Sequence, residues 1–400
     1  MEPRPATPSL LRELNDRTAL ELLLTRGPMT RAQIGEHTGL SKVTAAQLLV
    51  RLEDRGLVQI TGTQSGGRGP NAAVYAVVPS SAYVAGLHVE ADVVSAGVAD
   101  ITGQVIKVIA VDPNGSLDPL ALVHKAVSKV CRAADIEVDR LRSFVIGSPG
   151  VVDPLSGDIR LAVNMPEWHE GVLDALRNDL GRPVIIENDA NLAAMAEHAV
   201  GAAQGFSDFA LVWIDMGLGL AAVLGGKVHK GVAGAAGEIG YLPVPRGGVS
   251  ENVRGPLTGA FQSMAGAAAV LRLAADFGFS GGTGTDGAVA AKAVSDAAAD
   301  AAAGGTKGQE FLDELASRVA HGVAAISVVL DPGLVVLGGG VGLAGGTGLA
   351  DRVAAAVGRI CPATPRVVPS TLKSGPVLRG AMLAAVDAVR QELLASVGPT

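Results

Sequence analysis

The amino-acid sequence predicts an α/β protein in which a small N-terminal domain precedes a larger, two-lobed one. Four hundred residues are too many for one ordinary domain and indicate two or three. Hydrophobic residues make up 48% of the chain but aromatic ones only 3%, and glycine reaches 53 residues, so the cores are aliphatic and turns are frequent. Apolar runs that stop just before a helical pattern, as at Glu187-Asn188-Asp189, favour strands alternating with helices.

Cysteine usage, hydropathy and charge narrow the class of protein. The two cysteines, Cys131 and Cys361, lie far apart in no ligand-like spacing, which favours a reducing cytoplasm over a disulfide framework. No apolar run approaches membrane-spanning length, so we expect a cytoplasmic protein with no membrane partner. Residues 1–80 carry a formal charge of +2 and the remainder −9, so only the first part favours an anionic partner.

The first domain, residues 1–80, has the pattern of a winged helix-turn-helix. Apolar residues at helical spacing predict a helix from Leu10 to Arg26. Thr30 and Gln33 match a capping box for a short second helix, and Ser41 caps a third that continues through Arg55. The glycine turn between the last two helices indicates a helix-turn-helix whose third helix is the recognition helix.

Two short strands then bracket a glycine-rich tip that carries Arg68, which is the shape of a wing. The strands are expected at Leu57 to Thr61 and Ala73 to Val78. We expect Gln47 to read an adenine, and Lys42 and Arg51 to contact phosphates. The residues expected to face DNA are Arg31, Ser41, Lys42, Thr44, Ala45, Gln47, Arg51 and Arg68. The alternative is a small helical adaptor domain with an ordinary loop.

The second domain, residues 81–400, follows a linker at Pro79-Ser80-Ser81 and opens with one ribonuclease-H-like unit. Its order is three strands, a helix, a strand, a helix and a strand, and two such units facing a cleft form an actin-like fold. The strands are expected at 83–89, 93–99, 104–111, 143–146 and 183–186, and the helices at 118–133 and 171–180.

The second unit is predicted from Phe209 onward. Its strands are expected at 209–216, 221–224 and 334–337, and helices at 312–330 and 377–395, with helix and a surface loop between 278 and 308. Several glycines surround Glu238 between Lys230 and Tyr241, which indicates backbone packed closely against another group.

Asn188 and Asp189 are the first candidate ligand-binding residues. They end a buried strand just before an alanine-rich helix, which places them at the carboxyl edge of a sheet, where α/β folds gather their ligands. The alternative is that one of them serves only as the N-cap of that helix.

Three further motifs, in one order, make the chain resemble the ROK family (repressor, open reading frame, kinase) over nearly its whole length. They are Gly147-Ser-Pro-Gly150-Val-Val-Asp153, Glu187-Asn-Asp189-Ala-Asn191 and Gly237-Glu238-Ile-Gly240. The wing, Gly66-Gly-Arg68-Gly-Pro70, is similar to the Gly-Gly-Arg-Pro wing of the repressor branch. The resemblance implies a two-lobed sugar-kinase-type domain behind the winged helix.

The resemblance also implies roles for individual residues. Asn188, Asp189 and Glu238 would hydrogen-bond sugar hydroxyls, Asp189 being the catalytic base of kinase members, and Gly150 would line the same cleft. Tyr241 occupies the position of a zinc-binding histidine, and no cysteine occurs from 244 to 261, so we expect no zinc.

The phosphate-binding motifs of kinase members are altered. His88-Val-Glu90-Ala91-Asp92 replaces an Asp-x-Gly-Gly-Thr hairpin, and Asp215-Met-Gly217-Leu-Gly219 replaces Gly-Thr-Gly-Ile-Gly. Acidic residues would therefore face the phosphates of ATP, which is unfavourable. We expect no catalytic residues and no cofactor.

The function predicted from these patterns is a transcriptional regulator, acting as a repressor on double-stranded operator DNA. A sugar or sugar-phosphate in the cleft would act through the Pro79–Ser81 linker on a homodimer or homotetramer. Two alternatives stay open: a regulator with a non-sugar effector or none, and a DNA-tethered sugar kinase using Asp189.

Overall fold

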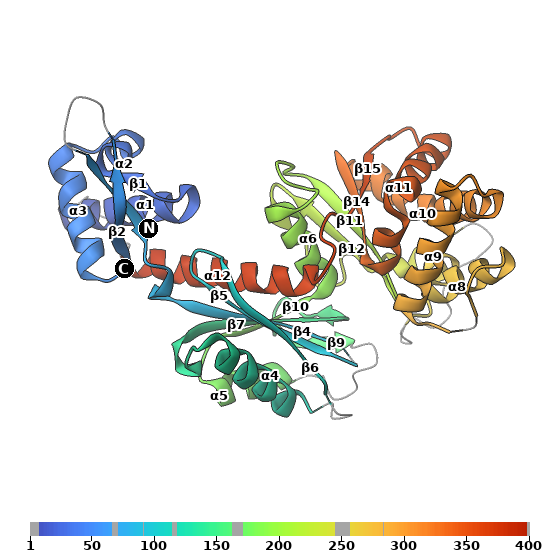
Figure 1. Ribbon diagram of the computed structural model, residues 1–400, viewed down its shortest axis with the longest axis horizontal. Coiled ribbons are helices and arrows are strands. Elements are labelled where there is room, and N and C mark those ends of the chain that lie inside the picture. The colour runs from blue at the N-terminus through green and yellow to red at the C-terminus, as the bar shows by residue number, and fades with distance from the viewer. Residues whose placement is uncertain are drawn as a thin grey trace.

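The computed structural model describes residues 8–65, 71–90, 92–113, 118–161, 171–244, 257–282 and 284–397. Figure 1 shows a small helical domain at one end, two α/β lobes, and the long helix α12 (Pro376–Val397) running between them. None of the helices in this described part is long and apolar enough to cross a membrane.

The N-terminal domain has the helices and the wing strands expected from the sequence. Its helices are α1 (Pro8–Arg26), α2 (Arg31–Thr38) and α3 (Lys42–Asp54), and its strands β1 (Met29–Thr30), β2 (Val58–Gln64) and β3 (Ala72–Val77) pair in the order β1-β3-β2. Both parts of the capping box between Thr30 and Gln33 are present, and Ser41 caps α3 by accepting from the Thr44 amide at 3.2 Å. The tip of the wing, with Arg68, lies outside the described residues.

The first lobe is a five-stranded sheet in the order β10-β7-β4-β5-β6, as the ribonuclease-H-like pattern predicted. Its elements are β4 (Tyr83–Val89), β5 (Val94–Asp100), β6 (Val105–Val111), α4 (Pro119–Ala134), η2 (Val138–Arg140), β7 (Leu141–Ser148), α5 (Val172–Leu180) and β10 (Val184–Asn188). Alternate residues of β4 face opposite sides: Ala85 and Leu87 pack with α4 and α5, whereas Val84 packs with α12. The sheet therefore lies between two helical layers.

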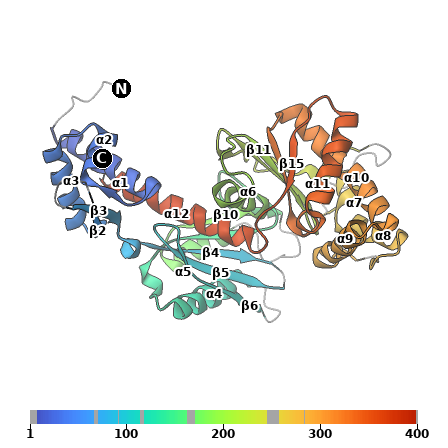
Figure 2. The ribbon, with the colours of Figure 1, turned by 45° about the horizontal axis from the view of Figure 1, so that its top comes forward.

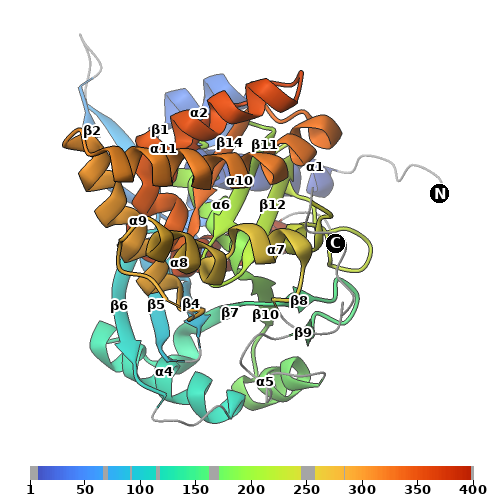
Figure 3. The ribbon, with the colours of Figure 1, turned by 90° about the vertical axis from the view of Figure 1, so that its right-hand side faces the viewer.

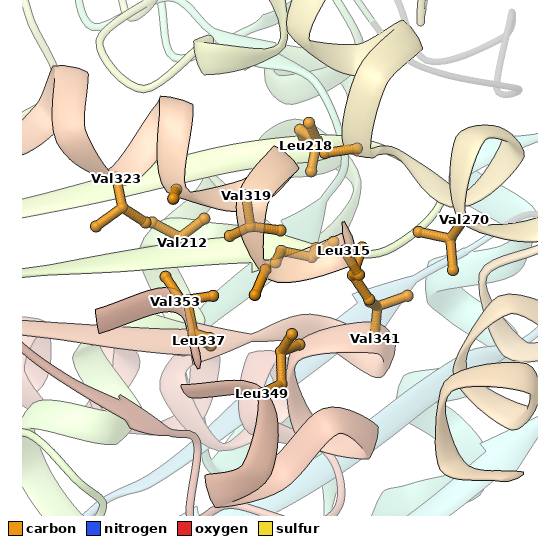
Figure 4. Packing of buried hydrophobic residues seen from close by; sticks show 14 of the residues in the cluster. Val212, Leu218, Val270, Leu315, Val319, Val323, Leu337, Val341, Leu349 and Val353 are labelled. Atoms are coloured by element: carbon orange, nitrogen blue, oxygen red, sulfur yellow. The ribbon is translucent and has the colours of Figure 1, made fainter. Parts of the chain in front are cut away.

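The second lobe is a five-stranded sheet in the order β13-β12-β11-β14-β15. Its elements are α6 (Asp189–Val200), β11 (Phe209–Ile214), β12 (Leu218–Leu224), β13 (Lys227–Val228), η3 (Ile239–Tyr241), α7 (Ala260–Ala265), α8 (Ala267–Asp276), α9 (Gly287–Ala302), α10 (Thr306–Leu330), β14 (Leu334–Gly338), α11 (Gly339–Ile360) and β15 (Arg366–Pro369). In Figure 3, where the right-hand side of Figure 1 faces the viewer, helices α7 to α11 lie in front of the sheet. Figure 4 shows the aliphatic core between them, where Val212 and Leu337 of the sheet meet Val319 and Val353.

Several elements of the second domain were not predicted. The hairpin of β8 (Val151–Val152) and β9 (Ile159–Leu161), the strand β15 and the helix α11 all lie in stretches that the sequence left without an assignment. Helix α11 contains seven glycines and is kinked at Gly346, so its propensity for helix is low and tertiary packing decides its structure.

Helix α12 joins the lobes to the N-terminal domain. It packs on α6, β4 and β7, and its last turns pack on α1 (Figure 2), where Leu393, Leu394 and Val397 share one core cluster with Leu20 and Leu23. The Arg55 guanidinium also donates to the Ser396 carbonyl oxygen at 3.2 Å. The predicted linker, Pro79–Ser81, forms the short 3-10 helix η1. The packing of α12 on α1 is a second connection between the domains, which the sequence did not indicate.

Candidate functional site

A cavity of about 940 Å³ lies between the two lobes. Four chain segments form most of its wall: the β10–α6 junction, the turn after β11, the segment that leads into η3, and the start of α9. All five residues predicted to bind a ligand line this one cavity, namely Gly150, Asn188, Asp189, Glu238 and Tyr241. The chain thus brings together side chains that are as many as 91 positions apart in the sequence.

Asn188 is the N-cap of α6 and also lines the cavity. It is the N-cap of α6, since its Oδ1 accepts from the Asn191 amide at 3.2 Å. Its Nδ2 donates to the Gly150 carbonyl oxygen at 3.0 Å, which ties the turn after β7 to the start of α6. The cap fixes the side chain at the cavity wall, so the structural role supports a binding role.

Glu187 lies beneath Asn188 and was not singled out by the sequence. This buried carboxylate accepts from the Asn188 amide and from Asn191 Nδ2, both at 2.9 Å. It also forms an ion pair with Lys230, which follows β13 of the second lobe. The pair therefore connects the two lobes at the cavity edge, between residues too far apart in sequence for a local pattern to reveal.

Asp189 is a carboxylate in the cavity wall whose pKa is strongly raised. Burial raises the pKa of Asp189 to about 7; the hydrogen bond from the Ala190 amide, at 2.7 Å, lowers it, while the charges of Asp215, Glu90 and Glu238 raise it further. A carboxyl group with such a pKa is part protonated near neutral pH. It can then donate a hydrogen bond as well as accept one, and a sugar hydroxyl can take either part.

Glu238 and Tyr241 enter the cavity from the segment around η3. Burial raises the pKa of Glu238. The preceding Gly237 has φ +105, and a Cβ there would lie 2.0 Å from the Leu220 carbonyl oxygen, so only glycine lets this backbone lie against β12. This explains the glycine that precedes Glu238 in the sequence motif.

Further carboxylates make the same cavity acidic. Glu90, Asp92 and Asp215 line it, and the cavity wall includes no lysine or arginine among the residues that the structure describes. His88 lies 3.5 Å from Glu90, but burial lowers the pKa of His88 to about 4, so it supplies no positive charge at neutral pH. Burial, Asp215 and Asp92 together raise the pKa of Glu90. Within the described ranges, no three His, Cys, Asp or Glu side chains are grouped as metal ligands.

The residues predicted to face DNA divide into exposed ones and ones that contact other parts of the domain. Arg31, Ser41, Lys42 and Gln47 are exposed, and Thr44 is half-exposed. The Ser41 and Thr44 hydroxyls lie 2.9 Å apart, so both side chains are held at the start of α3. This cluster of polar side chains at the N-terminus of the predicted recognition helix is the arrangement that the sequence predicted.

One residue predicted to face DNA is buried, a second is paired within the domain, and one exposed residue was missed. Ala45 is fully buried, because it belongs to the stripe of α3 that packs on the domain core. Arg51 is engaged within the domain: its Nε donates to Asp16 at 2.8 Å as part of a two-point ion pair. Val43 is 67% exposed beside Lys42 and can offer an apolar contact to a thymine methyl group.

Fold and site together define an actin-like, sugar-kinase-type domain joined to a winged helix. The model described as ROK family matches residues 84–387, and the one described as MarR family matches residues 14–69. The chain belongs to the ROK family and, with its N-terminal MarR-type winged helix, to the repressor branch of that family.

Three curated relatives show the range of the family. The DNA-binding transcriptional dual regulator NagC of Escherichia coli K12 is 26% identical over 59% of this chain and 58% of its own length. The xylose repressor of Bacillus subtilis strain 168 is 25% identical over 60% of this chain and 62% of its own. A glucokinase of Halalkalibacterium halodurans is 34% identical over 49% of this chain and 60% of its own. The chain thus spans about three fifths of the length of these relatives.

Solved structures support the fold. A ROK family transcriptional regulator, a homologue of the E. coli MLC protein, has a TM-score of 0.73 with coverage of 97% of this chain and 98% of that one, at 19% identity. The ROK hexokinase of Thermus thermophilus has a TM-score of 0.62 and 30% identity, covering 77% of this chain and 99% of that one. The second match lacks a counterpart for nearly a quarter of this chain.

Proposed function

We propose that this chain is a DNA-binding transcriptional regulator, acting as a repressor, whose operator affinity is controlled by a sugar or sugar derivative in the cleft. The observation that carries the proposal is the position of α6. Its first residues hold Asn188 and Asp189 at the cavity, and its length packs on α12, whose far end packs on the winged helix. A ligand that moves α6 can therefore act on the DNA-binding domain.

Two further features support a regulator over a kinase. The cavity is acidic, whereas a nucleotide would need cationic or glycine-rich surroundings, and Asp215 accepts from the Gly340 amide at 2.8 Å. Tyr241 in the cavity wall and the absence of cysteine from residues 244–261 leave no donor set for the zinc that family members commonly bind. We propose that the cleft binds an effector and does not phosphorylate it.

We further propose that the chain acts as a homodimer or homotetramer. Two recognition helices must be presented about 34 to 36 Å apart to occupy successive major grooves, so a shift in lobe closure transmitted by α12 can break the match. Size-exclusion chromatography with light scattering gives the oligomeric state. A monomer that still binds operator DNA with full affinity contradicts this part of the proposal.

Fluorescence anisotropy of the full chain on a labelled duplex from upstream of its own gene tests the function. We expect salt-sensitive, sequence-selective binding that one member of a panel of sugars and sugar phosphates reverses. The double variant Asn188→Ala/Glu238→Ala should bind DNA as wild type does but lose the sugar response. Lys107→Ala, on the exposed face of β6, serves as the control and should retain it.

Each other outcome selects a different function. DNA binding that no sugar alters contradicts the sugar effector and leaves a regulator with another ligand or none. An absence of selective DNA binding contradicts the regulator, and release of ADP from Mg-ATP with a sugar present then tests the kinase, with Asp189→Asn as the inactive control.

A further inference from the structure

Asp215 occupies the backbone donors at the start of α11, and we infer that its carboxylate makes the cleft select an unphosphorylated sugar over phosphate esters. The inference rests on the proposed function, because it names the chemical class of effector for the same cavity. It also narrows the earlier expectation, which admitted a sugar or a sugar phosphate alike. Asp215 is thus assigned as a specificity-determining residue.

The sheet topology brings Asp215 to this position. Strands β11 and β14 are parallel neighbours, with Trp213 paired to Gly338, so both end at the same edge of the sheet. Asp215 comes directly after β11, and α11 begins directly after β14. Two residues 125 positions apart are thereby placed in contact: Asp215 Oδ2 accepts from the Gly340 amide at 2.8 Å.

The other carboxylate oxygen of Asp215, Oδ1, also has close neighbours. Asp215 Oδ1 accepts from the Met216 amide at 2.9 Å, and the first residue of α9, Gly287, lies against it, since a Cβ there would come within 1.7 Å of that oxygen. The N-cap of α11 is Gly338, which has no side chain to accept a hydrogen bond. Asp215 therefore supplies a cap for α11 from another part of the chain.

Backbone amides at a helix start, together with the positive end of the helix dipole, are a common binding arrangement for phosphate groups. Here an anionic oxygen of the protein already takes the Gly340 amide. A phosphate that displaced Asp215 would leave this carboxylate beside it, with Glu90 and Asp92 lining the same cavity. Like charges so close are unfavourable, whereas neutral hydroxyls can accept or donate beside these carboxylates without that cost.

Asp286 provides a matched control for a general effect of charge. It lines the same cavity and caps the neighbouring helix, its Oδ1 accepting from the Ala288 amide at 2.8 Å and from the Val289 amide at 3.2 Å. It takes no part in the contact with Gly340. Asp215→Asn and Asp286→Asn each remove one negative charge from the cavity wall. Only Asp215→Asn weakens the hydrogen bond that the Gly340 amide of α11 donates to residue 215.

The first experiment is isothermal titration of the full chain with inorganic pyrophosphate, which needs no knowledge of the effector. Removal of the competing charge should let Asp215→Asn and Asp215→Ser bind pyrophosphate at least about tenfold more tightly than wild type, whereas Asp286→Asn should match wild type. Wild-type binding of pyrophosphate as tight as that of Asp215→Asn, or an equal gain in the Asp215 and Asp286 variants, overturns the inference. Asp215→Asn keeps an oxygen for the Gly340 amide, so the test holds even if Asp215→Ser does not fold.

The second experiment uses the sugar that releases operator DNA. Wild type should respond to this sugar at a concentration at least about tenfold lower than to its 6-phosphate, and Asp215→Ser should narrow that ratio. A 6-phosphate that is the better effector of wild type overturns the inference and leaves the proposed regulator standing. If no sugar releases DNA, the proposed effector fails instead, while the pyrophosphate titration still decides what Asp215 excludes.

Discussion

The carbonyl oxygen of Leu192 lies against Gly380, where a Cβ would come within 1.9 Å of it. This contact is the crossing point of α6 and α12, so the two helices meet backbone to backbone at a position where only glycine fits. The helix that starts at the cavity and the helix that ends at the winged helix are thus held in one fixed arrangement.

Gly380→Ala should therefore destabilise the chain by about 2 kcal/mol or more, because the obstructing atoms belong to backbone and cannot move aside cheaply. Urea unfolding measures the change. Gly358→Ala is the control, because Gly358 likewise lies within a helix but is exposed, and nothing lies within 4 Å of its Cβ position. Its replacement by alanine should stabilise α11 slightly. Equal effects of the two substitutions would contradict a close crossing.

Lys230→Met tests the ion pair between the lobes. Glu187 keeps its hydrogen bonds from Asn188 and Asn191 but loses its counter-charge. Because the Lys230 side chain is 47% exposed, we expect a loss of only about 1 kcal/mol in stability, together with a weaker sugar response. Thermal unfolding and the anisotropy titration measure the two effects. Lys227 is exposed nearby on β13, and Lys227→Met should change neither stability nor the sugar response. An equal loss in Lys227→Met would contradict a role for the ion pair of Lys230 with Glu187.

The raised pKa of Asp189 predicts a pH dependence. A carboxyl group with a pKa near 3.8 when unfolded and about 7 when folded binds more protons in the folded state between those values. Its contribution to stability is full below the lower value and is lost as the pH rises toward 7. Asp189→Asn removes this term, so stability relative to wild type should increase from pH 5 to pH 8. A difference that is constant over that range would show that Asp189 does not titrate there.

Lys42→Ala should weaken DNA binding by a similar factor on every sequence, since an exposed lysine at the start of the recognition helix meets phosphate. The slope of log affinity against log salt should fall by about 1. Anisotropy on operator and scrambled duplexes at several salt concentrations measures both. A loss confined to the operator would instead assign Lys42 to a base.

Arg51→Ala should behave differently, because its guanidinium is paired with the buried carboxylate of Asp16. Removal of one partner leaves the other without its charged hydrogen bonds, at a cost of about 2 kcal/mol in the stability of the N-terminal domain. The salt slope of DNA binding should stay at the wild-type value. A reduced slope with unchanged stability would restore the original prediction that Arg51 contacts phosphate.

Local patterns could be predicted from the sequence, and they account for most of the secondary structure. The Thr30–Gln33 capping box and the Ser41 cap depend on residues three positions apart, and both are present as predicted. Ala45 was misplaced because the sequence argument counted positions from the helix start and ignored which face Leu48, Leu49 and Leu52 commit to the core.

The contacts that shape the cleft could not be predicted, because their partners are distant in the sequence. Glu187 and Lys230 meet across two lobes, and Asp215 meets Gly340 only because β11 and β14 are neighbours in the sheet. The substitution of Asp215 for a family glycine was visible, but its hydrogen bonds were not. The placement of Asn188 and Asp189 was easier, since a strand end before a helix is a local signal.

The last turns of α12 hold Leu393, Leu394 and Val397 in the same core cluster as α1. During synthesis the winged helix leaves the ribosome first, whereas the helix against which it packs is made more than three hundred residues later. For most of its synthesis a nascent chain thus holds the N-terminal domain without the helix on which α1 packs. The packed connection between the winged helix and the two lobes can consequently form only late in translation, after the last turns of α12 have been made.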